Sequence, residues 1–153
     1  DMETQKSNPQ GNASLEGAEF TWNFYAGYYN KNNLPAQPTR TWVTKTIAEK
    51  DSDGTVHYVS RLADKYKVSG DSFYTQDGAA VLPLGTLTVE ETKSPSGYLL
   101  EGAYMQAAGS EEQITGLYIT QITEDGELSL PAAINFLYPT RSFVAACRYR
   151  NGI

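Results

Sequence analysis

Short runs in which hydrophobic and polar residues alternate recur along this chain of 153 residues. The clearest run begins at residue 18, and its apolar positions are Ala18, Phe20, Trp22 and Phe24. Successive side chains of a strand point to opposite faces, so this run predicts a half-buried β-strand. Thr39–Thr46 predicts a second strand, and the Tyr-, Asn- and Pro-rich stretch 27–37 predicts a long loop between the two.

Later segments repeat the same arrangement of short strands and turns. Residues 1–16 are polar and predict a loop-like lead-in, whereas 56–68 fit either a strand or short helical turns. Many short strands separated by turns about every ten residues predict an all-β chain that folds as a β-sandwich. The further strands and turns are expected at 51–54 (turn), 72–75, 76–78 (turn), 86–92, 116–123, 127–130 and 143–151.

One acidic residue conflicts with this simple pattern. In the strand 86–92, Leu87 and Val89 face one way, and period-two geometry sends Glu91 to the same side. A carboxyl group on an apolar face is costly unless it is paired or protonated. Glu91 therefore lies either at the wet end of its strand or inside the fold for a reason.

Composition narrows the class of protein. Twelve Lys and Arg against 18 Asp and Glu give a net charge of −6, which argues against partners such as nucleic acid or anionic membranes. A hydrophobic fraction of 40% suffices for a core, and 11 Tyr favour β-structure. No apolar run approaches the length of a membrane span, so we expect no membrane insertion.

Motifs for catalysis or cofactor binding are missing from the sequence. It contains no Gly-rich nucleotide loop, no zinc-protease motif and no esterase motif, and it predicts no cofactor and no metal site. The single cysteine, Cys147, shares a predicted strand face with Phe143 and Tyr149, which indicates core packing. A hydrolase that uses Cys147 and His57 is the enzymatic alternative.

Two distant segments carry a resemblance to a known family. The segment ASLEGAEF at 13–20 resembles the LxGAxF opening strand of Cna B-type domains. The segment LPLGTLTVEETKSPSGYLL at 82–100 resembles the ExxAPxGY strand and turn of the same domains. These SpaA-like, prealbumin-like domains occur in Gram-positive pilins and surface adhesins. Ser94 stands for the family's Ala before Pro95, and Leu87 stands for an aromatic residue. The resemblance extends over about residues 1–102 and is best over 17–102, while 103–153 fit only as later strands.

The resemblance implies a single module, 1–153, cut from a longer tandem array. Its fold would be a prealbumin-like, Ig-like β-sandwich of about seven or more strands with long loop insertions. Its function would be that of a structural or adhesive stalk module, extracellular and attached to the cell wall, with neighbouring domains of the same surface protein as partners. It would have no turnover activity.

Many domains of this family form an intramolecular isopeptide bond from a lysine to an Asn or Asp, assisted by a buried acid. The resemblance assigns the acid to Glu91, the residue that alternation also places inward. The family's lysine falls upstream of Asp1 in this comparison, and Lys6 is the nearest substitute. Asn151 in the last predicted strand is the acyl-donor candidate, although it also fits a turn before Gly152. We therefore expect the bond to be incomplete in this chain.

A ligand-binding domain is the second alternative. The segment FYAGYY at 24–29 contains Tyr25, Tyr28 and Tyr29 in or beside the predicted loop. Exposed aromatic rings can stack on sugars or meet a protein partner, so these residues are candidates for contact with a host glycan or host protein.

Overall fold

The computed structural model describes residues 3–7, 14–98, 100, 103–107, 110–123 and 133–137, and within 3–7, at 107 and within 133–137 only the backbone. The described part is almost entirely β-structure, as the sequence predicts. Its elements are β1 (Glu3–Ser7), β2 (Glu19–Tyr25), β3 (Arg40–Lys45), β4 (Ile47–Lys50), β5 (Val56–Arg61), the 3-10 helix η1 (Asp64–Tyr66), β6 (Lys67–Gly70), β7 (Tyr74–Gln76), β8 (Ala79–Val81), β9 (Gly85–Lys93), β10 (Tyr104–Ala107), β11 (Leu117–Ile122) and β12 (Ala133–Leu137).

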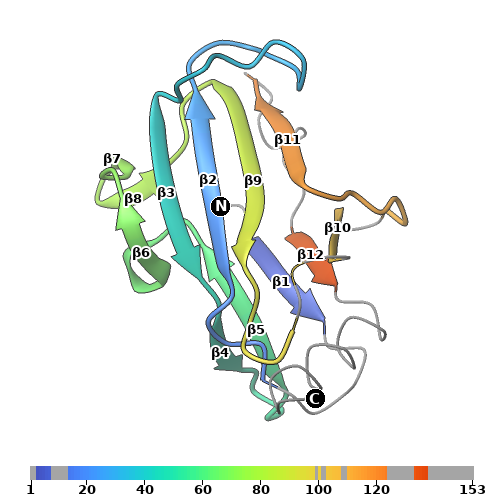
Figure 1. Ribbon diagram of the computed structural model, residues 1–153. Helices are drawn as coiled ribbons and strands as arrows, with labels where there is room; N and C mark the ends of the chain where they lie inside the picture. The colour runs from blue at the N-terminus through green and yellow to red at the C-terminus, as the bar shows by residue number, and fades with distance from the viewer. Residues whose placement is uncertain are drawn as a thin grey trace.

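The strands form two main sheets, which face each other as a sandwich (Figure 1). The front sheet has the order β11-β9-β2-β3-β6, and all of its pairings are antiparallel. The back sheet has the order β10-β12-β1-β5-β4, in which β1 and β12 pair in parallel. The hairpin β7-β8 forms a small third sheet.

Aromatic residues of the front sheet fill the space between the two layers. The alternation predicted for β2 is confirmed, because Phe20, Trp22 and Phe24 are all at most 2% exposed. They pack with Trp42 of β3 and with Met105 of β10 from the back sheet. Full burial of such side chains contributes roughly 1.5–3 kcal/mol each, so this cluster stabilises the sandwich strongly.

Two crossings between the sheets flank the hairpin β4-β5. Thr46 separates β3 from β4, and its buried hydroxyl donates to the Leu15 carbonyl oxygen at 2.6 Å and accepts from the Ala18 amide at 3.1 Å. The second crossing passes from β5 through η1 to β6. The ambiguous stretch 56–68 is therefore strand, 3-10 turn and strand in succession.

The predicted turn at 76–78 joins β7 to β8. Asp77 and Gly78 both have positive φ, 53° and 83°, as a two-residue hairpin turn requires. The first strand of this hairpin begins at Tyr74, two residues later than the sequence predicts.

Residues 3–7 differ from their prediction. The sequence predicts a loop-like lead-in, but Glu3–Ser7 is a central strand of the back sheet, between β5 and β12. A polar segment such as ETQKS can form a central strand, because the hydrogen bonds to both neighbouring strands come from its backbone. A pattern of hydrophobic residues does not reveal such a strand. The predicted strands at 127–130 and 143–151 lie outside the described residues.

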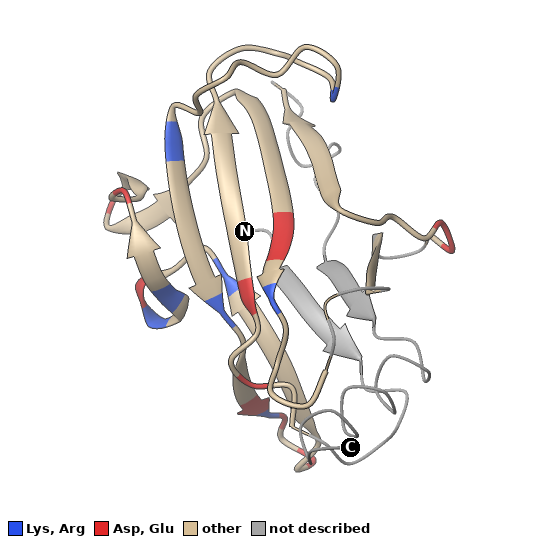
Figure 2. Ribbon diagram, in the orientation of Figure 1, with Lys and Arg blue, Asp and Glu red and all other residues tan. Residues whose placement is uncertain are grey.

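Charged residues of β2 and β3 lie at the ends of the strands rather than in their centres (Figure 2). At the lower end, Lys93 Nζ lies 3.8 Å from the Glu19 carboxylate. Within the described residues, no helix is long and apolar enough to span a membrane.

Candidate functional site

Glu91 lies on the inward face of the front sheet, as the period-two pattern predicts. Its side chain is 9% exposed, and it follows the fully buried Leu87 and Val89 along β9. Across the sheet it pairs with Phe20. The register shifts directly after this pair, because Glu19 pairs with Lys93 and leaves Thr92 as an extra residue. Such irregularities are common beside functional sites, where they redirect a side chain.

A cavity of about 220 Å³ lies beside Glu91 between β9 and β10. Its wall is mainly apolar, and Met105 contributes to it from the back sheet. A space of this size accommodates several water molecules or the end of a long side chain. The residues that line it are Glu90, Glu91, Leu100, Ala103, Tyr104, Met105, Ile114 and Gly116.

The two segments that carry the family resemblance meet next to this cavity. Leu15 and Tyr98, 1% and 5% exposed, form a second buried cluster, against which Tyr58 and Ala103 pack. The turn before Tyr98 is closed by the Ser94 hydroxyl, which donates to the Tyr98 carbonyl oxygen at 2.7 Å. Because Ala103 also lines the cavity, the buried carboxyl and both segments share one region of the fold.

Lys6 occupies a central position of the back sheet. It pairs with Tyr58 in β5 and with Phe136 in β12, and Phe136 in turn pairs with Met105 in β10. Met105 belongs to the main core and lines the cavity, whereas Tyr58 packs against the Leu15 and Tyr98 cluster. Lys6 thus lies in a row of paired residues across the back sheet, the register row of Lys6, which runs from Tyr58 to Met105. One end of this row contacts each of the two buried clusters that flank Glu91.

The predicted acyl donor, Asn151, lies outside the described residues. The strand that neighbours Lys6 contains a different amide, Asn135, but Asn135 pairs with Gln5 and Gln106, so alternation places it on the opposite face of the sheet from the row of Lys6. The sequence does not single out Asn135, because no alternation marks Ala133–Leu137 as a strand. The run contains only one polar residue among apolar ones.

The three tyrosines of the ligand-binding alternative differ in exposure. Tyr25 is buried, and its ring meets that of half-buried Tyr29 edge-on with centroids 6.4 Å apart. Tyr29 is held to the front sheet, since its amide donates to Thr86 Oγ1 at 2.9 Å and its carbonyl accepts from Gln121 Nε2 at 2.6 Å. Tyr28 alone of the three is more than half exposed, at 51%.

Of the two residues of the enzymatic alternative, only His57 lies within the described residues. His57 Nε2 lies 2.6 Å from the Asp51 carboxylate in the β4-β5 hairpin, on the surface. Cys147 lies outside the described residues. Within the described residues, no group of three or more His, Cys, Asp or Glu side chains is arranged to hold a metal ion.

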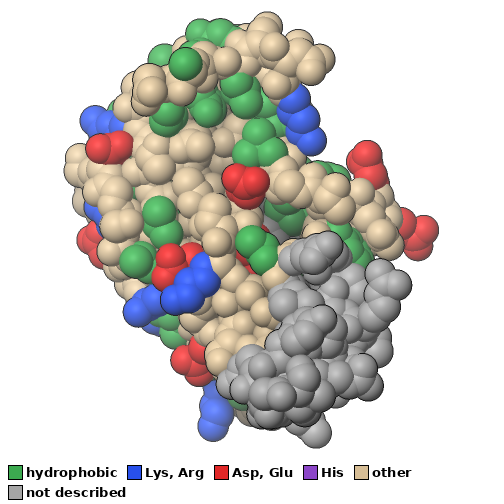
Figure 3. All heavy atoms as spheres, in the orientation of Figure 1, with side chains coloured by type: hydrophobic (Ala, Val, Ile, Leu, Met, Phe, Trp, Pro, Cys, Tyr) green, Lys and Arg blue, Asp and Glu red, His purple; other side chains and the backbone are tan. Residues whose placement is uncertain are grey.

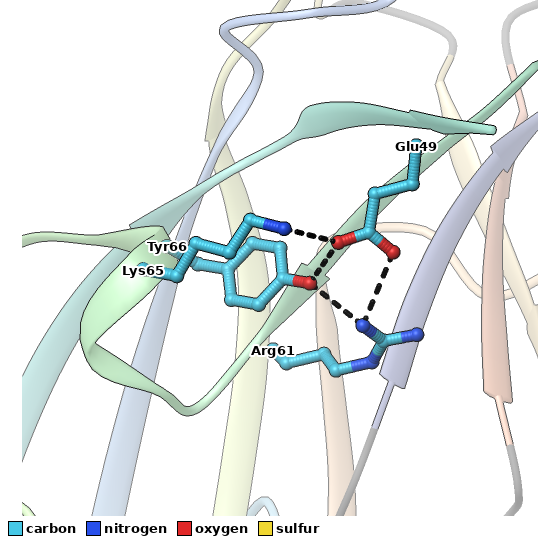
Figure 4. A network of polar contacts seen from close by, with 4 residues as sticks. All are labelled: Glu49, Arg61, Lys65 and Tyr66. Carbon is cyan, nitrogen blue, oxygen red and sulfur yellow. Dashed lines mark hydrogen bonds and ion pairs between the residues drawn. The ribbon is translucent and has the colours of Figure 1, made fainter.

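A polar network at the second crossing was not predicted from the sequence (Figure 4). Glu49 of β4 accepts hydrogen bonds from the Tyr66 hydroxyl, from Lys65 Nζ at 3.0 Å and from Arg61 Nη1 at 3.3 Å. Arg61 also donates to the Tyr66 hydroxyl oxygen at 2.6 Å. The Tyr66 hydrogen bond is the main cause that lowers the pKa of Glu49, while burial is the main cause that raises the pKa of Tyr66.

Comparison with known proteins gives no relative: the chain matches no protein-family model and no curated protein. The assignment of the site therefore depends on the geometry around Glu91 and on the residues of the two segments that meet there.

Proposed function

We propose that this chain is a structural module of a Gram-positive cell-surface protein or pilin, in which an isopeptide cross-link between strands stabilises the sandwich. The observation that carries the proposal is the burial of Glu91 beside the cavity between the sheets. Its partners are neighbouring domains of the same surface protein. A single exposed ring, Tyr28, offers less support for the ligand-binding alternative.

The chemistry requires three side chains and no cofactor. The neutral amine of a lysine attacks the side-chain carbonyl carbon of an asparagine, a new C–N bond forms, and the bond to the amide nitrogen breaks. The proton lost by the attacking nitrogen is passed through the carboxyl group to the departing nitrogen, which leaves as ammonia. Removal from water favours both the neutral amine and the neutral carboxyl group, and the folded core holds the reactants together.

Lys6 and Glu91 take the roles of amine and acid in this proposal. The strand position of Lys6, on the register row that includes Met105, supports its choice over the more distant lysines. Asn151, the residue that the sequence suggests, is the candidate for the acyl donor. Each chain reacts once, so the reaction is self-cross-linking and not enzymatic turnover.

An intact-mass measurement tests the cross-link. The sequence alone predicts an incomplete bond, but the strand position of Lys6 supplies a candidate amine, and the proposal therefore predicts a formed bond. We expect the wild-type chain to be lighter than its sequence by one ammonia, and the Glu91→Ala variant to have the full mass. In the chain-entropy model for cross-links, a loop of more than about 100 residues stabilises by roughly 4–5 kcal/mol, so Glu91→Ala should also melt at a lower temperature. Peptide mapping then identifies which asparagine is joined to Lys6.

Glu90→Ala provides the matched control, since Glu90 is the exposed neighbour of Glu91 on the same strand. It should retain the mass deficit and the melting temperature of the wild type. A wild-type chain with its full mass would contradict the cross-link, and so would a deficit that persists in Glu91→Ala or in Lys6→Arg.

A further inference from the structure

A groove of about 760 Å³ lies on one side of the sandwich, and we call it the lateral groove. One wall is the segment 62–67, which leads from β5 through η1 into β6, and the opposite wall is the hairpin β7-β8 (Figure 1). Ser72 and Phe73 lie between the two walls along the chain. Every residue that lines the groove belongs to the described part of the chain. The volume is in the range of roughly 300–1,000 Å³ that is typical of small-molecule sites.

Small residues on the hairpin keep the lateral groove open. Gly78, Ala79 and Ala80 line it from the hairpin side, at and directly after the tight turn of Asp77 and Gly78. None of these three lining residues has a side chain larger than a methyl group. Longer side chains here would occupy the space between the hairpin and η1, so this sequence leaves room for a ligand.

Both walls are anchored to the sandwich before any ligand binds. The Ser72 carbonyl oxygen accepts hydrogen bonds from Arg40 Nη1 at 3.0 Å and from Trp42 Nε1 at 3.1 Å. Tyr74, which begins β7, meets the Trp42 ring edge-on with centroids 6.1 Å apart, and the Arg40 guanidinium lies 3.7 Å from the Tyr74 ring centroid. The network around Glu49 holds η1 on the other side. A site that is already ordered loses little conformational freedom on binding, which favours affinity.

The lining of the lateral groove combines an apolar floor with separate polar groups. Phe73 is half-buried and packs against the main core, and the buried Leu62 belongs to that core. Asp64 offers a carboxylate that accepts hydrogen bonds, Lys67 an ammonium group that donates them, and Thr75 a hydroxyl that does both. A sugar ring has the same division, because its C–H groups form an apolar face that packs on aromatic rings and its hydroxyl groups project from the edge. The lateral groove therefore matches a carbohydrate better than a purely apolar molecule.

Charges in the lateral groove balance. Asp64 and Lys67 are the two charged residues of its lining. Figure 3 shows acidic and basic side chains near one another on the side of β6, β7 and β8, instead of a patch of one sign. Lys67 Nζ is positioned by a hydrogen bond of 2.7 Å to the Asp71 carbonyl oxygen, which uses one of its three N–H donors. Ionised groups form strong hydrogen bonds with neutral hydroxyls, so this pair favours an uncharged, hydroxyl-rich ligand.

We propose that the lateral groove binds a neutral oligosaccharide. One sugar ring lies against Phe73, and its hydroxyl groups form hydrogen bonds with Asp64, Lys67 and Thr75. Neither Glu91 nor Tyr28 lines the groove, so this site is separate from the cross-link and from the aromatic loop. The proposal adds carbohydrate binding to the structural role of the module.

An array of neutral oligosaccharides, followed by an NMR titration with the sugar that binds best, tests this proposal. We expect saturable chemical-shift changes at the amides of residues 62–67 and 72–80. An array without a binding sugar would overturn the proposal, and so would shift changes centred on residues 24–29. Saturable binding of trialanine at the groove in place of any sugar would assign it to a peptide-like ligand and refute the carbohydrate class.

Variants that shorten polar side chains test the predicted hydrogen bonds. Asp64→Ala should weaken binding about tenfold, because it removes a charge-assisted hydrogen bond, and Thr75→Ala should weaken it less. Gln76→Ala is the matched control, since Gln76 is the exposed neighbour of Thr75 on β7 and lies outside the lining of the groove. It should bind like the wild type.

A second pair of variants tests the space itself. Ala79→Trp fills the groove from the hairpin side and should abolish binding, whereas Val81→Trp places the same side chain on the same strand outside the lining and should preserve it. Both positions are exposed, so both variants should melt close to the wild-type temperature, which separates a loss of binding from a loss of folding. Binding that Asp64→Ala and Ala79→Trp leave unchanged would contradict the proposal.

Discussion

At the scale of single residues, one hydroxyl group connects the two sheets through the core. Thr44 of β3 is fully buried, and its Oγ1 accepts hydrogen bonds from Trp22 Nε1 at 2.8 Å and from the Ser60 hydroxyl at 2.7 Å. Ser60 belongs to the back sheet, so the contact crosses the sandwich. Thr88 of β9 is equally buried, but its hydroxyl has no hydrogen-bond partner among the described residues.

The same substitution should therefore have opposite effects at these two positions. Thr44→Val keeps the shape of the side chain but removes the acceptor of the Trp22 N–H group, and we expect a loss of about 1–3 kcal/mol in the free energy of unfolding. Thr88→Val removes a buried hydroxyl without a partner, so it should leave stability unchanged or raise it. Urea denaturation of both variants measures the difference, and similar losses at the two sites would refute this account.

At the scale of elements, the network around Glu49 fixes the crossing from the back sheet to the front sheet. Glu49 lies on β4, Arg61 ends β5, and Lys65 and Tyr66 belong to η1, so four polar groups hold three consecutive elements together. The Tyr66 side chain is buried beneath this network. The network gives the short 3-10 turn tertiary support that its own hydrogen bonds do not supply.

Stability should respond to pH through this network. The pKa of Glu49 is lower in the folded chain than its ordinary value of 4.5, so its contribution is present above that value and is lost as the pH falls through the folded pKa. The pKa of Tyr66 is raised above 10.0, so its contribution is present below that value and is lost as the pH rises through the folded pKa. Melting temperatures measured from pH 2 to pH 11 should show both limbs.

Tyr66→Phe separates the two causes. It removes the hydroxyl that contributes most to the low pKa of Glu49 but retains the buried ring, so both limbs should become shallower. Burial also raises the pKa of Tyr118, which leaves part of the alkaline limb in place. Lys50→Gln, an exposed change at the end of the same strand, should alter neither limb. Limbs that Tyr66→Phe does not change would show that other groups determine the pH dependence.

The strands differ in how well the sequence predicts them. Strands with one apolar face, such as β2 and β9, are predictable because alternation follows directly from burial, and the inward position of Glu91 follows from the same rule. Strand β1 is hidden in polar sequence, and β12 in an almost continuous apolar run. The place of Lys6 beside both strands depends on long-range pairing, which neither propensity nor spacing encodes.

The Glu49 network illustrates the same limit for side chains. Glu49, Arg61 and Tyr66 lie in separate segments, and each would be ordinary on a polar surface. Their meeting depends on the turn between β5 and β6, for which periodicity allowed two structures. The exposure of Tyr28 and the burial of Tyr25 likewise depend on how the loop folds back on Thr86 and Gln121.

At the scale of the whole molecule, the parallel pairing of β1 with β12 joins strands from opposite ends of the described chain. Tension applied between Glu3 and Leu137 pulls these strands in opposite directions along their length, so the five register pairs of the ladder must yield together. Tension between Glu19 and Lys45, which are paired at adjacent ends of β2 and β3, opens that ladder one pair at a time. Single-molecule force spectroscopy should give a higher rupture force for the first geometry, and equal forces would contradict this prediction.

In the proposed role, the same ladder would resist tension along the chain. Forced unfolding is governed by the barrier to opening rather than by equilibrium stability, and a ladder in shear places that barrier at the first step. If the proposed amide bond also ties β1 at Lys6 to a later part of the chain, tension passes through that bond and bypasses the sandwich core. A module of this kind would transmit tension along a stalk without unfolding or extending.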